Sequence, residues 1–283
     1  MRILVTGATG GLGRLIINKL LNQGVEVIAT SHDPHEVPNC DFFNKVKYFP
    51  FDINKQDGAD LCSYFGKPDA LIHLAWEKLD EYKNEAHITT ILENHKKFIT
   101  NLIEGGLKDI TAVGTCYEYG LQEGILRENM ASQPILPYPQ GKNLLREFIE
   151  AKQKSSDFSF KWIRVFYVFG EVRGRKNLFT LLVNAVNNKE ESFNMSGGEQ
   201  VRDFLSPDEI AQRIVKIALQ NKIQGIINCC SGKPVKLKNF VNDFLTQNNF
   251  KIKLNLGVYP YPDYEPMETW GDSEKLKRIL GEK

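Results

Sequence analysis

The chain has 283 residues and a formal net charge of +1 at pH 7, from 36 basic and 35 acidic side chains. Because basic and acidic side chains are nearly equal in number, the chain has no excess of positive charge for binding a nucleic acid. No apolar run approaches the length that spans a bilayer. No signal peptide precedes the first strand, and the cysteines and histidines form no metal-ligand cluster. We therefore expect a cytoplasmic protein that binds no nucleic acid, membrane or metal, with one large α/β unit and a smaller lobe.

The chain opens with an apolar strand that runs directly into a glycine-rich turn and a helix. Gly7, Gly10 and Gly13 follow this strand at three-residue spacing, and Gly24 ends the helical stripe behind them. Gly7 allows a tight turn, Gly10 a close approach of the backbone to a phosphate, and Gly13 close packing of the helix on the strand. The pattern predicts a dinucleotide pyrophosphate at the helix N-terminus. Its predicted contacts are Gly7, Thr9, Gly10, Gly11, Leu12 and Gly13.

Further along the chain, strand-like runs alternate with helical periods. Strands are expected at residues 25–29, 46–51, 70–74, 110–114 and 160–169, and helices at 85–104, 139–152, 207–220 and 237–246. This alternation predicts an α/β, Rossmann-type, doubly wound parallel sheet with its ligand site at the carboxyl ends of the strands.

Beyond Gly170 the alternation loosens, which suggests a second lobe. We expect residues 1–170, with about 199–230, to form the dinucleotide-binding domain, and about 171–198 and 231–283 to form a smaller α+β substrate lobe. The basic run at 173–176 fits a solvated face or a phosphate contact. The proline-rich run at 259–266 cannot form a regular helix, and we interpret it as a binding or lid segment.

Three side chains are candidates for acid–base chemistry. Tyr138 and Lys142 stand four residues apart on a predicted helix, so they share a face. An ammonium near a phenol stabilises the phenolate and lowers the pKa of the tyrosine, which makes it a usable proton donor. Thr115 adds a hydroxyl directly after the strand at 110–114.

Together these motifs resemble the extended short-chain dehydrogenase/reductase family, in its nucleotide-sugar branch, over essentially the whole chain. The resemblance implies that Thr115 hydrogen-bonds the reacting sugar oxygen, Tyr138 is the general acid/base, and Lys142 binds the nicotinamide ribose and tunes Tyr138. It also implies a nucleotide-diphosphate sugar as substrate.

The resemblance extends to binding residues. Asp52 and Ile53 match the pair beside adenine, and Leu74, Ala75 and Trp76 match the turn beside the nicotinamide ribose, where His73 is interpreted as structural. Arg202, followed by Asp203, matches the arginine that contacts the substrate pyrophosphate, with a structural Arg202–Asp203 ion pair as the alternative. The substrate contacts that the resemblance implies are Trp76, Thr115, Tyr117, Glu118, Asn177, Leu178 and Arg202.

The cofactor expected from the sequence is NADP. NAD enzymes with this fold usually have a carboxylate at the end of the second strand, and here none occurs before Asp33. Arg14 matches a position that often holds the 2′-phosphate in relatives that use NADP, and Ser31 and His32 add hydrogen-bonding groups. The alternative for Arg14 is a solvated helix residue.

The expected reaction is reduction. Cys116 stands where the family's dehydratases have an aspartate, and the segments around Trp76, Thr115 and Trp270 resemble NDP-4-keto-6-deoxyhexose reductases, which finish deoxysugars for bacterial surface polysaccharides such as O-antigen or capsule. An NAD-dependent 4-epimerase remains the main alternative, and a non-catalytic NADP-binding regulatory or assembly protein is a third. Family members commonly dimerise through the helices that begin near Glu85 and Pro139, so a homodimer is expected. Phe98, Leu102 and Phe148 either serve that contact or pack on the sheet.

Overall fold

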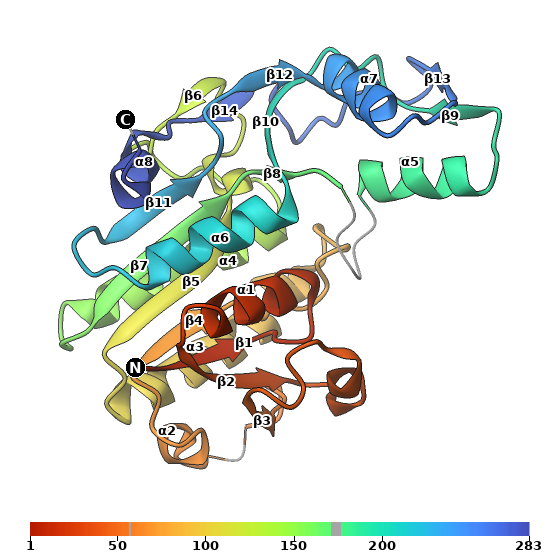
Figure 1. The fold of residues 1–283 in the computed structure, drawn as a ribbon. Coiled ribbons are helices and arrows are strands. Elements are labelled where there is room, and N and C mark those ends of the chain that lie inside the picture. The colour runs from red at the N-terminus through yellow and green to blue at the C-terminus, as the bar shows by residue number, and fades with distance from the viewer. Residues whose placement is uncertain (57, 171–176, 283) are drawn as a thin grey trace.

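The structure is a computed structural model that describes residues 1–56, 58–170 and 177–282 (Figure 1). Its main sheet has seven strands in the order β11-β7-β5-β4-β1-β2-β3, and every neighbouring pair is parallel. The order reverses direction between β1 and β4, which makes their carboxyl ends the point where a ligand binds in such sheets. The predicted doubly wound parallel sheet is confirmed. Its strands are β1 (Arg2–Thr6), β2 (Glu26–Ser31), β3 (Lys47–Pro50), β4 (Ala70–His73), β5 (Asp109–Thr115), β7 (Ser159–Val165) and β11 (Gly225–Cys229).

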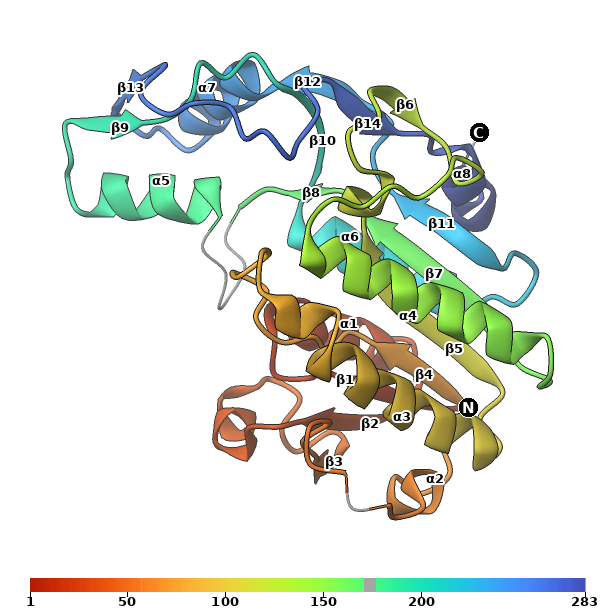
Figure 2. The same ribbon diagram turned by 180° about the vertical axis from the view of Figure 1, so that it is seen from behind.

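Helices cover both faces of this sheet. α1 (Gly11–Leu21) and α6 (Pro207–Ala218) lie side by side on the face seen in Figure 1. α3 (Thr90–Glu104) and α4 (Pro137–Gln153) cover the opposite face (Figure 2). The short helices are α2 (Leu61–Tyr64), α8 (Glu274–Leu280), η1 (Pro34–Asn39), η2 (Glu85–His87) and η3 (Cys116–Tyr119).

Each face of the sheet has its own apolar core because successive side chains of a strand point to opposite faces. Ile3 and Val5 belong to the core under α1 and α6, whereas Leu4 belongs to the core under α3 and α4. Phe98 and Leu102 of α3 are fully buried in that second core. They therefore pack on the sheet, and they are not available for a contact with another subunit.

The second lobe lies above the carboxyl ends of the sheet (Figure 1). A cluster of phenylalanines that includes Phe179, Phe204 and Phe240 forms its core. β11 and α6 lie with the main sheet, whereas β10, from the same predicted block at 199–230, pairs with β8 and β12. The remaining elements are β6 (Gly124–Leu126), β8 (Tyr167–Val168), α5 (Leu178–Asn187), β9 (Ser192–Asn194), β10 (Val201–Leu205), β12 (Pro234–Lys236), α7 (Leu237–Gln247), β13 (Lys253–Asn255) and β14 (Thr269–Gly271).

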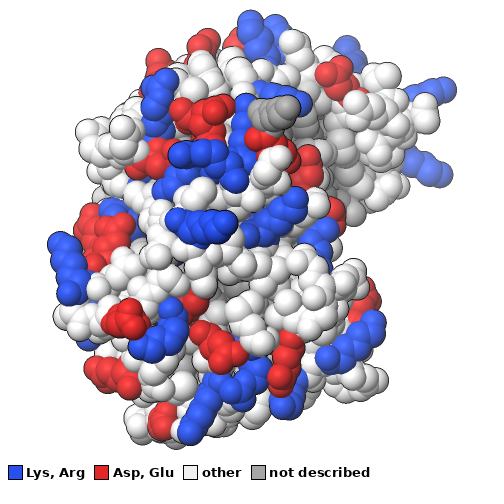
Figure 3. Space-filling view, turned by 60° about the vertical axis from the view of Figure 1, so that its left-hand side comes forward, with Lys and Arg blue, Asp and Glu red and all other residues white. Residues whose placement is uncertain are grey.

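Two predicted elements are interrupted. The single helix expected at 85–104 is divided into η2 and α3, because the backbone of Thr89 between them is not helical (φ −118°, ψ −101°). The strand expected at 160–169 is divided at Phe166, and its second part, β8, pairs with β10. Among the residues described, no helix is long and apolar enough to cross a bilayer. Acidic and basic side chains are interspersed on the face shown in Figure 3.

Candidate active site

The glycine turn after β1 has the geometry that the sequence predicts. Gly7 has a φ of +65°, and a Cβ on Gly13 would lie 2.2 Å from the carbonyl oxygen of Gly7. Both positions therefore require glycine. Gly10 is the N-cap of α1 and offers no side-chain hydrogen bond, so a pyrophosphate fits against the amides of this helix N-terminus.

The turn after β4 is bonded to the glycine turn. The Thr6 hydroxyl accepts hydrogen bonds from the amides of Leu74 (3.1 Å) and Ala75 (3.2 Å). A Cβ on Gly7 would lie only 3.0 Å from the Ala75 nitrogen. Leu74 and Ala75 consequently lie beside the predicted pyrophosphate site, at the position where the sheet order reverses.

The candidate catalytic residues are anchored at the carboxyl end of β5. Lys142 donates a hydrogen bond from Nζ to the carbonyl oxygen of Val113, at 2.9 Å, two residues before Thr115. The Tyr138 amide donates to the carbonyl oxygen of Tyr82 at 3.0 Å, and the two rings stack with centroids 5.1 Å apart. Thr115, Tyr138 and Lys142 are all buried. The structure thus brings this end of β5 and the first turns of α4 together.

The α4 helix can approach this closely because Gly141 has no side chain. A Cβ at Gly141 would lie 2.2 Å from the carbonyl oxygen of His87 in η2 and 3.2 Å from the ring of Trp76. Any larger residue would push α4 away from η2, and Tyr138 and Lys142 would move with it.

The Trp76 ring lies against the ammonium group of Lys142. Its indole is 7% exposed, donates from Nε1 to His87 at 3.0 Å, and stacks on His95 with centroids 4.6 Å apart. The Lys142 ammonium lies 4.3 Å from the centroid of the indole ring. Trp76 is not among the residues that line the pocket described below, and η2 and α3 pack around its side chain, so its contact with the substrate stays a prediction.

A chain of hydrogen bonds links Thr6 to the surface through two buried histidines. His73 bonds Thr6 at 2.9 Å and His95 at 2.8 Å, and His95 bonds the Glu77 carboxylate at 3.2 Å. Because a carboxylate accepts, His95 donates from Nε2, accepts at Nδ1 from His73, and His73 accepts from the Thr6 hydroxyl. Both imidazoles are then neutral. Burial lowers the pKa of His73 and of His95, and the nearby Lys142 lowers both further.

A pocket of ≈ 820 Å³ opens between the sheet and the second lobe. Four predicted substrate residues line it together: Tyr117, Asn177, Leu178 and Arg202. The Asn177 side chain also caps α5, because its Oδ1 accepts from the Thr180 amide at 2.8 Å. The basic run at 173–176 lies outside the described residues.

The other residues that line the pocket include Tyr82, Tyr167 and Glu265, to which the sequence assigned no individual role. Aromatic rings connect it to Tyr138, because Tyr82 stacks on Tyr138 and meets Tyr117 edge-on at 5.8 Å. Tyr117 meets Tyr167 edge-on at 5.9 Å. The only sequence signal for Tyr82 or Tyr167 is an aromatic residue in or near a loop, whereas Glu265 is an acid in the proline-rich run.

Arg202 pairs with Glu265 rather than with Asp203. Arg202 donates to Glu265 at 3.0 Å, and NH1 donates to two backbone carbonyl oxygens. Asp203 instead accepts from the amides of Ser231 and Gly232. The alternative of an Arg202–Asp203 ion pair is therefore wrong.

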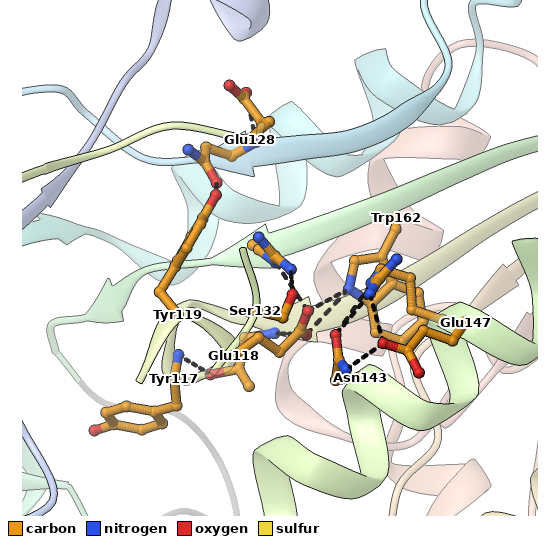
Figure 4. Close-up of polar contacts among 12 residues, drawn as sticks. Tyr117, Glu118, Tyr119, Glu128, Ser132, Asn143, Glu147 and Trp162 are labelled. Atoms are coloured by element: carbon orange, nitrogen blue, oxygen red, sulfur yellow. Dashed lines mark hydrogen bonds and ion pairs between the residues drawn. The ribbon is translucent and has the colours of Figure 1, made fainter. Parts of the chain in front are cut away.

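Glu118 points away from the pocket, which corrects its predicted role as a substrate contact. It is 0% exposed, and its carboxylate accepts from the Thr115 amide (2.9 Å), the Trp162 indole (3.0 Å) and Arg164 (2.9 Å) (Figure 4). The bare Cα of Gly114 leaves room for this carboxylate, since a Cβ there would lie 2.2 Å from it. Glu118 therefore braces the turn that carries Thr115.

Arg14 already has partners within the protein, and its contact with a 2′-phosphate stays a prediction. Its guanidinium donates to the carbonyl oxygens of Thr9 (2.8 Å) and Asn39 (2.7 Å) and pairs with Glu36 at 3.0 Å. The alternative of a solvated residue does not describe this side chain, which is only 14% exposed. Ser31 is buried and shares a hydrogen bond with the Tyr48 hydroxyl at 2.9 Å, whereas His32 is exposed.

After β3, the Asp52 carboxylate accepts from Asn54, and Ile53 is buried in the core under α3.

Burial raises the pKa of the Cys116 thiol, and the Glu265 carboxylate raises it further, so this thiol stays protonated. The described part of the chain contains no group of three metal-ligating side chains.

Comparison with known proteins agrees with this geometry. Residues 3–230 match the model of the NAD dependent epimerase/dehydratase family. A dTDP-6-deoxy-L-talose 4-dehydrogenase (NAD(+)) from Aggregatibacter actinomycetemcomitans is 32% identical, over 96% of this chain and 99% of its own. A CDP-abequose synthase from Salmonella muenchen is 24% identical, over 98% and 91%. A UDP-N-acetylglucosamine 4-epimerase from Methanobrevibacter ruminantium shares the fold, with a TM-score of 0.86, 20% identity, and 98% and 91% coverage.

The sheet, the glycine turn and the Tyr138–Lys142 helix define a dinucleotide-binding protein of the short-chain dehydrogenase/reductase class. The chain belongs to the NAD dependent epimerase/dehydratase family. The resemblance predicted from the motifs is thereby confirmed.

Proposed function

We propose that the protein reduces the C4 ketone of a nucleotide-linked 4-keto-6-deoxyhexose to an alcohol, in the synthesis of a bacterial surface-polysaccharide sugar. The observation that carries the proposal is the anchoring of Thr115, Tyr138 and Lys142 at the end of β5, beside a pocket that contains Tyr117, Asn177 and Arg202. The 32% identical relative is named as a 4-dehydrogenase of a dTDP-6-deoxyhexose, which fits this chemistry.

A reduced nicotinamide, when bound, would supply the hydride that the proposed reaction adds to C4 of the sugar. Tyr138 gives its phenolic proton to the C4 oxygen, so the ketone gains one hydride and one proton and becomes an alcohol. Thr115 donates a hydrogen bond to that oxygen and orients it. The Lys142 ammonium stabilises the phenolate left on Tyr138. The Val113 carbonyl oxygen and the Trp76 ring hold this ammonium in place.

Two cofactors are candidates. NADPH is favoured by Arg14, Ser31 and His32, which are the groups proposed to hold a 2′-phosphate. NADH is favoured by the Arg14–Glu36 pair, because a 2′-phosphate would have to displace the Glu36 carboxylate. The name of the 32% identical relative, which specifies NAD(+), also fits NADH.

A homodimer through α3 and α4 remains part of the proposal. These helices lie side by side on one face of the sheet. Leu144 is 41% exposed on α4, so it is a candidate contact in place of the buried Phe98 and Leu102.

The proposal is tested with purified protein, NADPH or NADH, and 4-keto-6-deoxyhexoses linked to dTDP, GDP or CDP. Loss of the reduced-nicotinamide absorbance with one of these sugars is the expected result. The cofactor that is oxidised faster is then identified as the reductant. Oxidation with none of them, together with NAD retained through purification, would instead favour the 4-epimerase.

A further inference from the structure

Arg202 has little freedom in the pocket. Its NH1 group donates to the carbonyl oxygens of Val201 (2.9 Å) and Met267 (3.1 Å), and its guanidinium lies 5.0 Å from the centroid of the Tyr167 ring. Its side chain is 4% exposed. The NH2 group is the part that faces Glu265, so the carboxylate occupies an edge of the guanidinium that a phosphate would need.

Glu265 is held there by three donors. Oε1 accepts from the Tyr117 hydroxyl at 3.0 Å, and Oε2 accepts from the Tyr167 hydroxyl at 3.2 Å and from Arg202 at 3.0 Å. Burial, and then the Glu265 charge, raise the pKa of Tyr117, so this phenol stays protonated and keeps donating. The arrangement is a complete anion site, and a side chain of the protein itself supplies the anion.

The charged residues that line the pocket show why the Arg202–Glu265 pair matters for an anionic ligand. Arg202 is the one lysine or arginine among the described residues that line it, whereas Glu190 and Glu265 both line it. With Arg202 neutralised, the described lining offers no unpaired cation to a diphosphate. A diphosphate that binds Arg202 must therefore separate Glu265 from it, because the two anions would otherwise compete for one guanidinium.

The segment that carries Glu265 is free of helix and strand. Residues 256–266 connect β13 to β14 as turns and irregular chain along the pocket, and Tyr259, Pro260 and Pro262 also line it. Its side chains reach solvent, with Tyr259 57% and Tyr261 40% exposed. Glu265 can consequently leave Arg202 without breaking a strand pairing.

We propose that Glu265 is an internal competitor that occupies Arg202 until the diphosphate of the substrate replaces it, and so sets the affinity and selectivity of the pocket for diphosphates. This inference rests on the proposed function, since it assumes a nucleoside-diphosphate ligand. It deepens that function by assigning Glu265 as a specificity-determining residue.

The test is calorimetric titration of the full-length protein with dTDP, UDP and GDP. Glu265→Gln keeps the shape and an acceptor oxygen but removes the charge. We expect it to lower the Kd of the preferred diphosphate about tenfold, which is the effect of losing one hydrogen-bonded ionic competitor. Glu268→Gln is the matched control, because Glu268 is an exposed carboxylate three residues further along the chain, and the Kd of this variant should equal that of the wild type.

A second comparison tests whether the gain acts through Arg202. In an Arg202→Gln background, adding Glu265→Gln should no longer lower the Kd, because the competition has been removed. An unchanged or higher Kd in Glu265→Gln alone would overturn the inference and would indicate a carboxylate that binds the sugar. An equal gain in Glu268→Gln would overturn it as well. Binding is measured without turnover, so absent ketone reduction beside a tenfold gain would count against the proposed reaction only.

Discussion

The Lys142 ammonium lies 4.3 Å from the centroid of the Trp76 indole, and the same indole donates a hydrogen bond to His87. His87 accepts this bond at Nδ1, because the indole N–H can only donate, and an imidazole that accepts at a ring nitrogen is neutral. The buried network beneath the helix therefore has one cation, Lys142, above a row of neutral rings. This arrangement makes Trp76 a positioning residue for the proposed chemistry.

Trp76→Phe should lower kcat about fivefold, because a phenyl ring holds the ammonium less well by about 1 kcal/mol and makes no bond to His87. A less well held ammonium stabilises the Tyr138 phenolate less, so the alkaline limb of the kcat–pH profile should move to higher pH. Steady-state kinetics across pH check this. Trp270→Phe is the control. Equal profiles for wild type and Trp76→Phe would leave Trp76 with a packing role alone.

Tyr138→Phe should reduce kcat by about 10²- to 10⁴-fold, the usual loss when a general acid is removed. Cofactor binding should be retained, because the ring and its stacking on Tyr82 remain. Turnover and quenching of protein fluorescence by the reduced cofactor measure the two effects. The exposed Tyr64→Phe should behave like the wild type. A kcat for Tyr138→Phe within threefold of the wild type would remove the assigned acid.

The buried histidines make stability depend on pH. In the unfolded chain they titrate near pH 6.5, whereas burial lowers the pKa of His73 and His95 in the folded state. The unfolded state therefore binds more protons as the pH falls below about 6.5, and the free energy of unfolding decreases by about 1.4 kcal/mol per pH unit for each histidine. Above that pH this contribution is fully present.

His95→Gln should make this decrease shallower by about 1.4 kcal/mol per pH unit. Urea unfolding between pH 5 and 8 provides the measurement, with the exposed His35→Gln as control. Parallel curves for His95→Gln and the wild type would show that His95 is not held neutral.

Glu118→Gln should reduce the free energy of unfolding by about 3–5 kcal/mol, because it leaves the buried Arg164 without its counter-charge. Glu26→Gln removes an exposed partner of Lys47 and should cost less than about 1 kcal/mol. Urea titrations of both variants supply the comparison. A Glu118→Gln protein as stable as the wild type but with a raised KM for the sugar would contradict this role and would indicate that Glu118 contacts the substrate.

Glu36→Gln should raise kcat/KM for NADPH relative to NADH about fivefold, because it frees Arg14 from a charged hydrogen bond worth about 1 kcal/mol or more. The ratio of the two kcat/KM values is the measurement, and Glu93→Gln, from an exposed pair, is the control. An unchanged ratio would mean that Arg14 does not select the cofactor.

The sheet and the glycine turn were predictable because local signals determine them. Gly7 and Gly13 occupy positions where the backbone admits no side chain, and apolar periodicity identifies the strands. The division of the predicted helix before α3 was not predictable, since it depends on the burial of His87 against Trp76 and Gly141.

The roles of charged residues were harder to predict because their partners are distant in sequence. Glu118 is drawn inward by Arg164 from a neighbouring strand, and Glu36 reaches Arg14 through the η1 turn. Glu265 accepts from Tyr117, which lies 148 residues earlier in the chain. The local sequence identifies such a carboxylate. It does not identify the distant cation whose position decides whether the carboxylate points toward a pocket or away from it.

The proposed reaction is tested most directly by isotope transfer. The protein is incubated with its 4-keto-6-deoxyhexose substrate and a reduced nicotinamide cofactor that carries deuterium at the transferred position, and the product is examined by NMR. The account predicts one deuterium on C4 of the sugar for each cofactor oxidised. A product without deuterium at C4, or an epimerised sugar formed with no net oxidation of the cofactor, would contradict it.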